Sequence, residues 1–94
     1  MVSMMIRLKV LPDKVSEFEP LVAQLMRDVA ANEPGSIYEV RRVRDEPCSY
    51  VYFLSFPDQA AYDRYAAADY HMQMSPKALA CVDGDPVFAD LEPI

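Results

Sequence analysis

The stretch of sequence that decides the fold is Tyr50–Met74, YVYFLSFPDQAAYDRYAAADYHMQM. Its opening run, YVYFLSF, is apolar and shows no regular alternation of polar and apolar residues. This pattern predicts a strand that is covered on both of its faces. Pro57 lacks an N–H group for a neighbouring strand, so the strand is expected to end there. Asp58 can accept hydrogen bonds from free backbone N–H groups and is the expected N-cap of a helix. The stretch therefore predicts a buried strand that leads directly into a helix.

This predicted helix gathers aromatic side chains on one side. Tyr62 and Tyr65 share a helical face with Ala61 and Ala66, because they recur at helical spacing. His71, the only histidine of the chain, closes the stretch. Histidine is the side chain whose ordinary pKa lies nearest to neutral pH. If this small protein has a reaction centre, it is expected here.

Residues Met1–Leu11, MVSMMIRLKVL, predict a first strand upstream of this stretch. Alternate side chains form an apolar face that is expected to meet helices, whereas the other face is mixed and suits a partly open or interface surface. The apolar face comprises Met4, Ile6, Leu8 and Val10. A helix is predicted from about Lys14 or Ser16 to about Ala31, because apolar residues recur there at helical steps. Gly35 is the expected turn residue after this helix.

Turn signals place the remaining elements. Ser36–Asp45 predicts a second strand, which the turn DEPCS joins to the strand YVYFLSF as a hairpin. Asp69 can cap a further short helix through Met74; Pro76 is expected to interrupt it, and KALACV can resume it. Gly84 is expected to end the helical region, and PVFADLEPI predicts a short fourth strand.

The predicted element order is β-α-β followed by β-α-β, with no linker between the halves. This order is typical of the split βαβ, ferredoxin-like fold, an α+β arrangement with a four-stranded antiparallel sheet. Residues 1–94 are expected to form a single domain. Both helices cover one face of such a sheet, and the bare face here carries apolar residues. We therefore predict a homodimer in which two sheets pack face to face.

Composition limits the classes of partner. The net charge of −6 at pH 7 argues against nucleic acid and against anionic membrane surfaces. No apolar run approaches the ~20 residues needed to span a bilayer, and Met1–Met5 lack the long apolar core of an export signal. The two cysteines, Cys48 and Cys81, are far apart in sequence and form no CxxC pair, although one disulfide between them is arithmetically possible. A reduced, cytoplasmic protein is the favoured interpretation.

The sequence resembles the antibiotic biosynthesis monooxygenase (ABM) family of dimeric α+β barrel proteins. The resemblance rests on four segments: MIRLKVLPDKVSEFEPLV, ANEPGSIYEVRRVRDEP, FPDQAAYDRYAAADYHMQM and DPVFADLEPI. The resemblance covers nearly the whole chain and implies a dimer of two ferredoxin-like domains. The family includes cofactor-independent oxygenases of polyphenols and quinols, haem-degrading enzymes, and isomerases of small signalling molecules.

The chain departs from the haem-degrading branch of the family at several positions. That branch carries an asparagine on the first strand, where this chain has Ile6, and a tryptophan on the second helix, where it has Tyr65. Its iron-ligating histidine aligns near Ser75, one turn after His71. Phe56 stands where many members end the third strand with a tryptophan. The resemblance makes Ile6 and Phe56 expected substrate contacts, and neither haem, nor another cofactor, nor a metal is expected.

Helix residues supply the remaining candidates. His71 could take a proton from a phenol or an enol, although a structural hydrogen-bond partner would equally account for it. Tyr62, Tyr65 and Tyr70 could form a flat wall for a planar phenolic ligand, and ordinary helix-to-sheet packing is expected to account for at least one of them. Tyr62 is an expected substrate contact. Tyr65 is the preferred residue to orient the substrate, because it aligns with the family's helix aromatic.

Two charged clusters receive structural interpretations. Arg41, Arg42 and Arg44 could hold a carboxylate or a phosphate, but a solvated strand edge is the favoured interpretation. Asp83 and Asp85 flank a glycine, which is typical of a turn more than of a metal loop.

The favoured function is a cofactor-independent monooxygenase of a quinol or polyphenol, with a small aromatic substrate and dioxygen as its partners. An electron-rich substrate anion can reduce oxygen directly, so the protein needs to supply a dry pocket, orientation and a base. His71 is the predicted base and Tyr65 the predicted orienting residue. The alternative is an isomerase or a non-catalytic binder of a small metabolite on the same fold.

Overall fold

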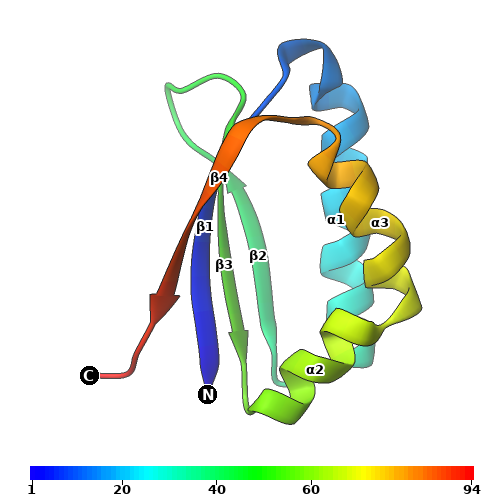
Figure 1. Cartoon of the computed structure of the whole chain (residues 1–94), viewed down its shortest axis with the longest axis vertical. Coiled ribbons are helices and arrows are strands. Elements are labelled where there is room, and N and C mark those ends of the chain that lie inside the picture. Colours follow the sequence, from blue (N-terminus) through cyan, green and yellow to red (C-terminus); the bar gives the residue numbers. More distant parts are fainter.

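A computed structural model describes residues 1–94 and has the α+β, ferredoxin-like architecture (Figure 1). Four antiparallel strands form one sheet, and the helices cover one of its faces. The elements in chain order are β1 (Val2–Val10), a short 3-10 turn η1 (Pro12–Lys14), α1 (Val15–Asn32), β2 (Ile37–Arg42), β3 (Ser49–Phe56), α2 (Gln59–Ala67), α3 (Asp69–Leu79) and β4 (Val82–Leu91). The predicted fold class is therefore confirmed.

The strand order β2-β3-β1-β4 puts β1 and β3 in the centre of the sheet. The helix-facing side of β3 is buried through Tyr50, Tyr52 and Leu54. On the opposite side of the same strand, Phe53 is 38% exposed. The two-sided apolar character of this strand is thus satisfied on one side by the helices, and a single chain leaves the other side open to solvent.

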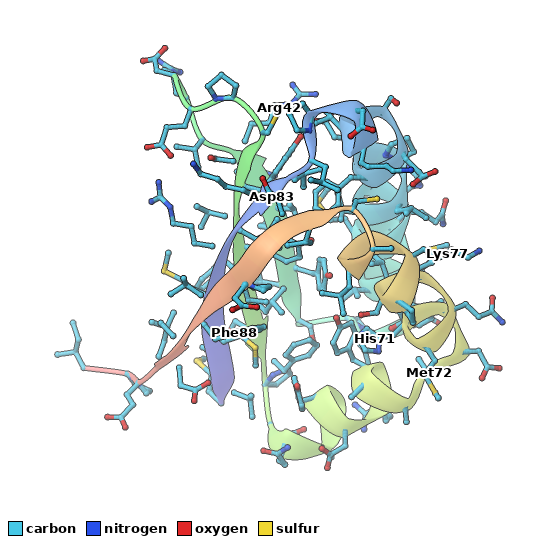
Figure 2. All side chains as sticks on the ribbon, turned by 45° about the horizontal axis from the view of Figure 1, so that its top comes forward. Arg42, His71, Met72, Lys77, Asp83 and Phe88 are labelled. Atoms are coloured by element: carbon cyan, nitrogen blue, oxygen red, sulfur yellow. The ribbon has the colours of Figure 1, made fainter.

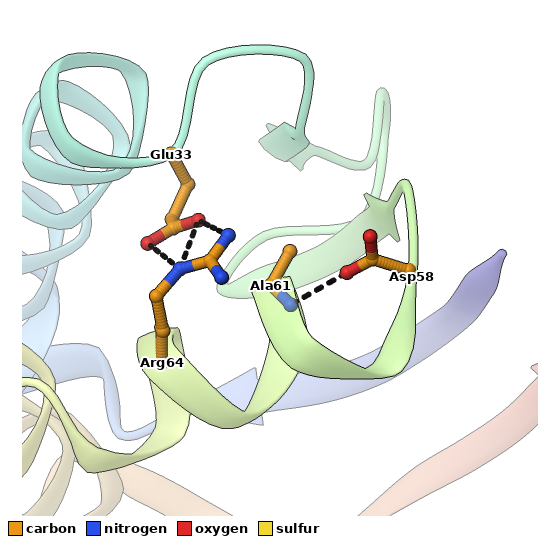
Figure 3. Close-up of polar contacts among 4 residues, drawn as sticks. All are labelled: Glu33, Asp58, Ala61 and Arg64. Atoms are coloured by element: carbon orange, nitrogen blue, oxygen red, sulfur yellow. Dashed lines mark hydrogen bonds and ion pairs between the residues drawn. The ribbon is translucent and has the colours of Figure 1, made fainter.

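Local signals account for the start of α2. The Asp58 carboxylate accepts a hydrogen bond from the Ala61 N–H at 2.8 Å, so Asp58 is the N-cap that the sequence predicts (Figure 3). Gly35 has a φ of 89° in the turn after α1, a conformation that a residue with a Cβ seldom adopts. The predicted turn role of Gly35 is confirmed.

The region after α2 differs from the prediction. Pro76 lies inside α3 and does not interrupt it, and the Ala80 N–H donates to the Pro76 carbonyl at 3.0 Å. Proline removes the donor that would pair with the carbonyl of Met72, one turn earlier. Both residues are exposed, so water can solvate that carbonyl and the helix continues.

The fourth strand is longer than predicted. It begins at Val82, so Asp83, Gly84 and Asp85 belong to β4 and do not end a helix. The strand pairs with β1 through most of its length. The pairing is interrupted by a bulge, because Lys9 of β1 is opposite Asp83 whereas Arg7 is opposite Val87. Gly84 has a φ of 78° within this bulge. Gly84 thus allows the change of strand register. From the sequence alone, a glycine with this role cannot be distinguished from a glycine that ends a helix.

An ion-pair cluster attaches α1 to the β2–β3 hairpin. The Arg42 Nε donates to Glu19 Oε2 at 2.8 Å, and the Tyr50 hydroxyl donates to the same carboxylate. The hydrogen bonds from Arg42 and Tyr50 lower the pKa of Glu19 to about 2. Arg42 lies on the edge strand β2 with its side chain largely exposed, as predicted, and it also has a specific partner in Glu19.

Other expectations can be compared directly with the side chains. Cys48 and Cys81 are both free thiols, so the disulfide that was possible from the sequence does not form in this structure. Cys81 is fully buried, together with core residues such as Phe18 and Phe56. No helix has the combination of length and apolar character that a membrane crossing requires.

Candidate functional site

A cavity of about 200 Å³ lies between the helix-facing side of the sheet and the helices α1, α2 and α3. Of its 17 lining residues, 14 are apolar, so water inside it finds few partners. Ile6 and its neighbours on β1 form the floor, and Tyr62, Tyr65 and His71 contribute from the helices. Figure 2 shows His71 on α3 and Phe88 on β4 on opposite sides of this space. The cavity is therefore built by elements from both ends of the chain.

Tyr65 is the centre of an aromatic cluster in the cavity wall. It is only 5% exposed, and its ring centroid lies 4.4 Å from that of His71 and 5.7 Å from that of Tyr38. Behind it, the ring of Phe56 lies at 5.1 Å. Tilted rings at these separations pack favourably, so each ring restrains the others. The cavity therefore has a closely packed aromatic wall on this side.

His71, on α3, is held by a hydrogen bond to the end of the preceding helix α2. Its Nδ1 lies 3.1 Å from the carbonyl oxygen of Ala66. A carbonyl can only accept, so this contact assigns the proton of the neutral imidazole to Nδ1. Nε2 then carries the free lone pair, and His71 lines the cavity. In the neutral ring, this tautomer leaves Nε2 as the nitrogen that can accept a proton.

Three tyrosines of the wall keep their protons. Burial raises the pKa of Tyr65, and the neighbouring Tyr38 raises it further. Burial is also the largest cause of the raised pKa of Tyr52 and of Tyr38. An apolar environment disfavours the charged phenolate, which is the physical reason for all three shifts. These hydroxyls are neutral near pH 7 and can donate hydrogen bonds to a ligand oxygen.

Four of the five predicted site residues meet at this cavity. Ile6, Tyr62, Tyr65 and His71 line it together, although they come from β1, α2 and α3. Phe56 is fully buried, with its ring centroid 5.4 Å from that of Tyr62, and it is not part of the lining. Its position is that of a support behind the wall. The direct substrate contact that the resemblance implies for Phe56 stays a prediction.

The cavity also has lining residues from β2, β3 and β4 that were not predicted from the sequence. Tyr38 and Tyr52 line the cavity from β2 and β3. Their alternation with outward-facing residues places them on the helix side, but it does not show that a cavity lies above them. Phe88 and Pro86 line it from β4. The only available signal for these two was an apolar pair in a strand predicted as short.

The helix α2, which carries Tyr62 and Tyr65, is fixed at its outer side by an ion pair. Arg64 donates to both carboxylate oxygens of Glu33 at distances from 3.0 to 3.3 Å (Figure 3). The Glu33 side chain, at the end of α1, is 9% exposed. Paired hydrogen bonds of this kind also fix the relative orientation of the two groups. Glu33 and Arg64 thereby hold α2 against α1 and keep the aromatic wall in place.

Charged metal-binding groups do not converge at this site. No three His, Cys, Asp or Glu side chains of the structure lie together in a way that could hold a metal ion. The chemistry that the site can perform with its own groups is proton abstraction by His71, hydrogen bonding by tyrosine, and exclusion of water.

Comparisons with known proteins agree on a family and a fold. The family model described as antibiotic biosynthesis monooxygenase matches residues 1–77. A Caulobacter crescentus protein assigned to the antibiotic biosynthesis monooxygenases is 28% identical, with a TM-score of 0.90 over 99% of this chain and 89% of that one. Another antibiotic biosynthesis monooxygenase is 20% identical, with a TM-score of 0.87 over 100% of this chain and 99% of that one.

A third solved structure is that of a protein described as an enzyme. SnoaB, a cofactor-independent oxygenase from Streptomyces nogalater, is 23% identical, with a TM-score of 0.75 over 98% of this chain and 91% of that one. At this identity the likeness concerns the fold. No curated protein matches the chain.

Proposed function

Because the chain belongs to the antibiotic biosynthesis monooxygenase family, we propose that it is a cofactor-independent monooxygenase of a small quinol or related phenol. The observation that carries the proposal is His71, which lines the apolar cavity beside the ring of Tyr65, with its Nδ1 3.1 Å from the carbonyl oxygen of Ala66. The similarity in fold to SnoaB, a cofactor-independent oxygenase, supports the same class of reaction. Fold alone does not fix a substrate, so the proposal rests on the residues of the cavity.

In the proposed reaction, His71 starts the chemistry by taking a phenolic proton. The resulting anion is electron-rich and passes one electron to dioxygen, and the two radicals join through a new C–O bond at a ring carbon. The protonated imidazole of His71 returns its proton to the peroxide anion, which gives a hydroperoxide. The same ring carbon then loses its hydrogen as a proton while the O–O bond breaks, the distal oxygen leaves as water, and the carbon becomes a carbonyl that enolises to the hydroxyquinone. One quinol and one dioxygen thus give one hydroxyquinone and one water.

The remaining wall residues orient and protect the substrate. Tyr65 lies against the ring of His71, and its neutral hydroxyl can donate to a substrate oxygen. Holding the phenol beside the base removes the entropic cost of bringing them together during reaction. Ile6 and Tyr62 line the same cavity and keep water from the anion.

Oxygen incorporation tests the proposal. With 1,4-dihydroxynaphthalene as probe, the protein is expected to raise oxygen uptake above the spontaneous rate and to yield 2-hydroxy-1,4-naphthoquinone with one atom from oxygen-18 gas. Spontaneous oxidation instead gives the plain quinone and hydrogen peroxide, so mass spectrometry and a peroxide assay separate the two reactions. Heat-denatured protein is the control. No incorporation across quinols with one, two and three rings would exclude the oxygenase assignment.

The alternative is an isomerase or a binder of a small metabolite in the same cavity. A base beside neutral hydroxyl donors also suits proton transfer within an enol, which needs no oxygen. Ligand binding without oxygen consumption would favour this alternative.

We further propose that the protein is a homodimer joined through the open side of the sheet. Met5, Ile37 and Phe53 are 40%, 45% and 38% exposed there, although all three are large and apolar. Contiguous apolar surface of this kind marks an interface, and an obligate one buries on the order of 2,000 Å² or more. The free thiols Cys48 and Cys81 suit a reducing compartment such as the cytoplasm.

Sedimentation at low micromolar concentration tests the dimer. We expect a dimer for the unaltered protein and a monomer for Phe53→Asp, because the new carboxylate would lose its hydration in the interface. Met72→Asp is the matched control, since Met72 is also exposed but lies on α3, away from the open side of the sheet. A compact monomer of the unaltered protein would contradict the proposal.

A further inference from the structure

We propose that Phe88, on the bulged edge strand β4, closes the mouth of the cavity and limits its ligand to one or two fused rings. The inference deepens the proposed function, because it takes a planar phenol as the ligand. It concerns a part of the chain that the family match does not reach, since that match ends at residue 77. The residues that carry it are Leu79, Gly84, Pro86 and Phe88.

Exposure shows where the cavity opens. Among its lining side chains, only Leu79 and Phe88 are mostly exposed, at 56% and 64%. Leu79 is the last residue of α3, and Phe88 lies on β4. The lining groups Tyr38, Tyr52 and Tyr65 are buried at the other side. The mouth therefore lies between the end of α3 and the edge strand, with one large apolar side chain at each margin.

The bulge in β4 places Phe88 at this margin. Between Lys9 and Arg7 the β1 strand advances by two residues, whereas β4 advances by four, from Asp83 to Val87. The two additional residues move Phe88 to the position opposite Ile6, which lines the cavity. Because the shift is an even number, Phe88 stays on the helix-facing side of the sheet. Bulges commonly redirect side chains next to binding sites.

The cavity is small, and most of its wall cannot give way. Its volume of about 200 Å³ is below the roughly 300–1,000 Å³ of pockets that hold drug-sized ligands. The floor and the aromatic wall are part of the close-packed core, which resists expansion. Phe88 is the large lining side chain with the greatest exposure, so it has fewer neighbours than the others. A third fused ring would thus have to displace Phe88 before any other group.

Binding of non-reacting phenols tests this inference independently of turnover. Dissociation constants of phenol, 2-naphthol and 2-hydroxyanthracene can be measured by calorimetry, or by ligand fluorescence, since the chain has no tryptophan. An open apolar surface prefers the larger ring system, because it buries more area. We expect the reverse: 2-hydroxyanthracene binds the unaltered protein at least about tenfold more weakly than 2-naphthol.

Substitutions at the mouth give the decisive comparison. Phe88→Ala is expected to remove the discrimination against 2-hydroxyanthracene. Phe88→Trp is expected to weaken the binding of 2-naphthol as well. Met72→Ala is the matched control, because Met72 is 61% exposed next to His71 and does not line the cavity; it should bind like the unaltered protein. An unchanged ratio in Phe88→Ala, or equal binding of both compounds before substitution, overturns the inference.

Two further outcomes separate this inference from the oxygenase proposal. If none of the three phenols binds but a quinol takes up labelled oxygen, the inference about the mouth is wrong and the oxygenase proposal stands. If ring number controls binding as expected but no quinol takes up oxygen, the mouth is assigned correctly and only the oxygenase chemistry fails.

Discussion

Replacing His71 by alanine is expected to lower the turnover of 1,4-dihydroxynaphthalene by about 10²-fold or more, the usual contribution of a general base. The substitution removes the only imidazole of the chain and leaves an apolar cavity with tyrosine donors but no proton acceptor near neutral pH. The free energy of unfolding should fall by only about 1 kcal/mol, the net value of one hydrogen bond, here from Nδ1 to the Ala66 carbonyl. Oxygen uptake and urea denaturation on the same variant check both expectations.

A second variant separates the base from the hydrogen bond. His71→Asn keeps an N–H donor that can reach the Ala66 carbonyl but has no basic nitrogen, so it should retain stability and still lose turnover. Met72→Ala, at the adjacent exposed position, should retain both. If His71→Ala keeps full turnover, His71 is not the base. The cavity around Tyr65 would then be a binding site without a proton acceptor.

The parts of the fold that were predicted correctly depend on signals that act within a few residues. In Tyr50–Met74 an apolar strand, a proline and a capping aspartate follow each other directly, and the structure has β3, the Asp58 cap and α2 in that order. Neighbouring residues decide such elements, so the sequence is sufficient. The order of elements then limits the topology, because sequential strands and helices in this pattern favour one packing.

The misplaced boundaries lie where distant contacts decide. Pro76 and Gly84 are both local signals for breaking a helix. In the structure, solvation of the exposed side of α3 allows Pro76 to stay within the helix, and pairing with β1 extends β4 back to Val82. The partner strand is more than seventy residues away in the chain, so its effect on Gly84 cannot be read from the neighbouring residues.

In the candidate site, too, local signals were predicted correctly and distant contacts were not. Tyr62, Tyr65 and His71 were identified from one continuous stretch of sequence. Helical spacing brings Tyr62 and Tyr65 together on α2, whereas His71 lies on α3 and reaches Tyr65 because the chain turns at Ala68. Tyr38, Tyr52 and Phe88 come from three separate strands, and the sequence predicts their face of the sheet but not the space above it. Whether an inward-facing side chain lines a cavity or fills the core depends on the distance between layers, which no local pattern records.

Phe56 gives the clearest test of that distinction, and Phe56→Ala is expected to lower the free energy of unfolding by about 3–5 kcal/mol. The side chain is 0% exposed and supports both Tyr62 and Tyr65, so truncation leaves a void that its neighbours fill only partly. The same truncation at Phe88, which is 64% exposed, should cost less than about 1 kcal/mol. Urea denaturation at one fixed protein concentration allows the comparison, because dimerisation would otherwise contribute.

The two roles of Phe56 predict different patterns. If Phe56 supports the wall from behind, the main effect of Phe56→Ala is a loss of free energy of unfolding. Phe56→Leu should then retain most of the stability of the unaltered protein, because the core volume is largely kept. Binding of 2-naphthol at a temperature where the variants are folded should then weaken only through the loosened rings of Tyr62 and Tyr65. A direct substrate contact, as the family resemblance implied, would instead weaken binding strongly in Phe56→Ala with little loss of stability. That result would show that the cavity extends past Tyr65 to Phe56 when a ligand is bound.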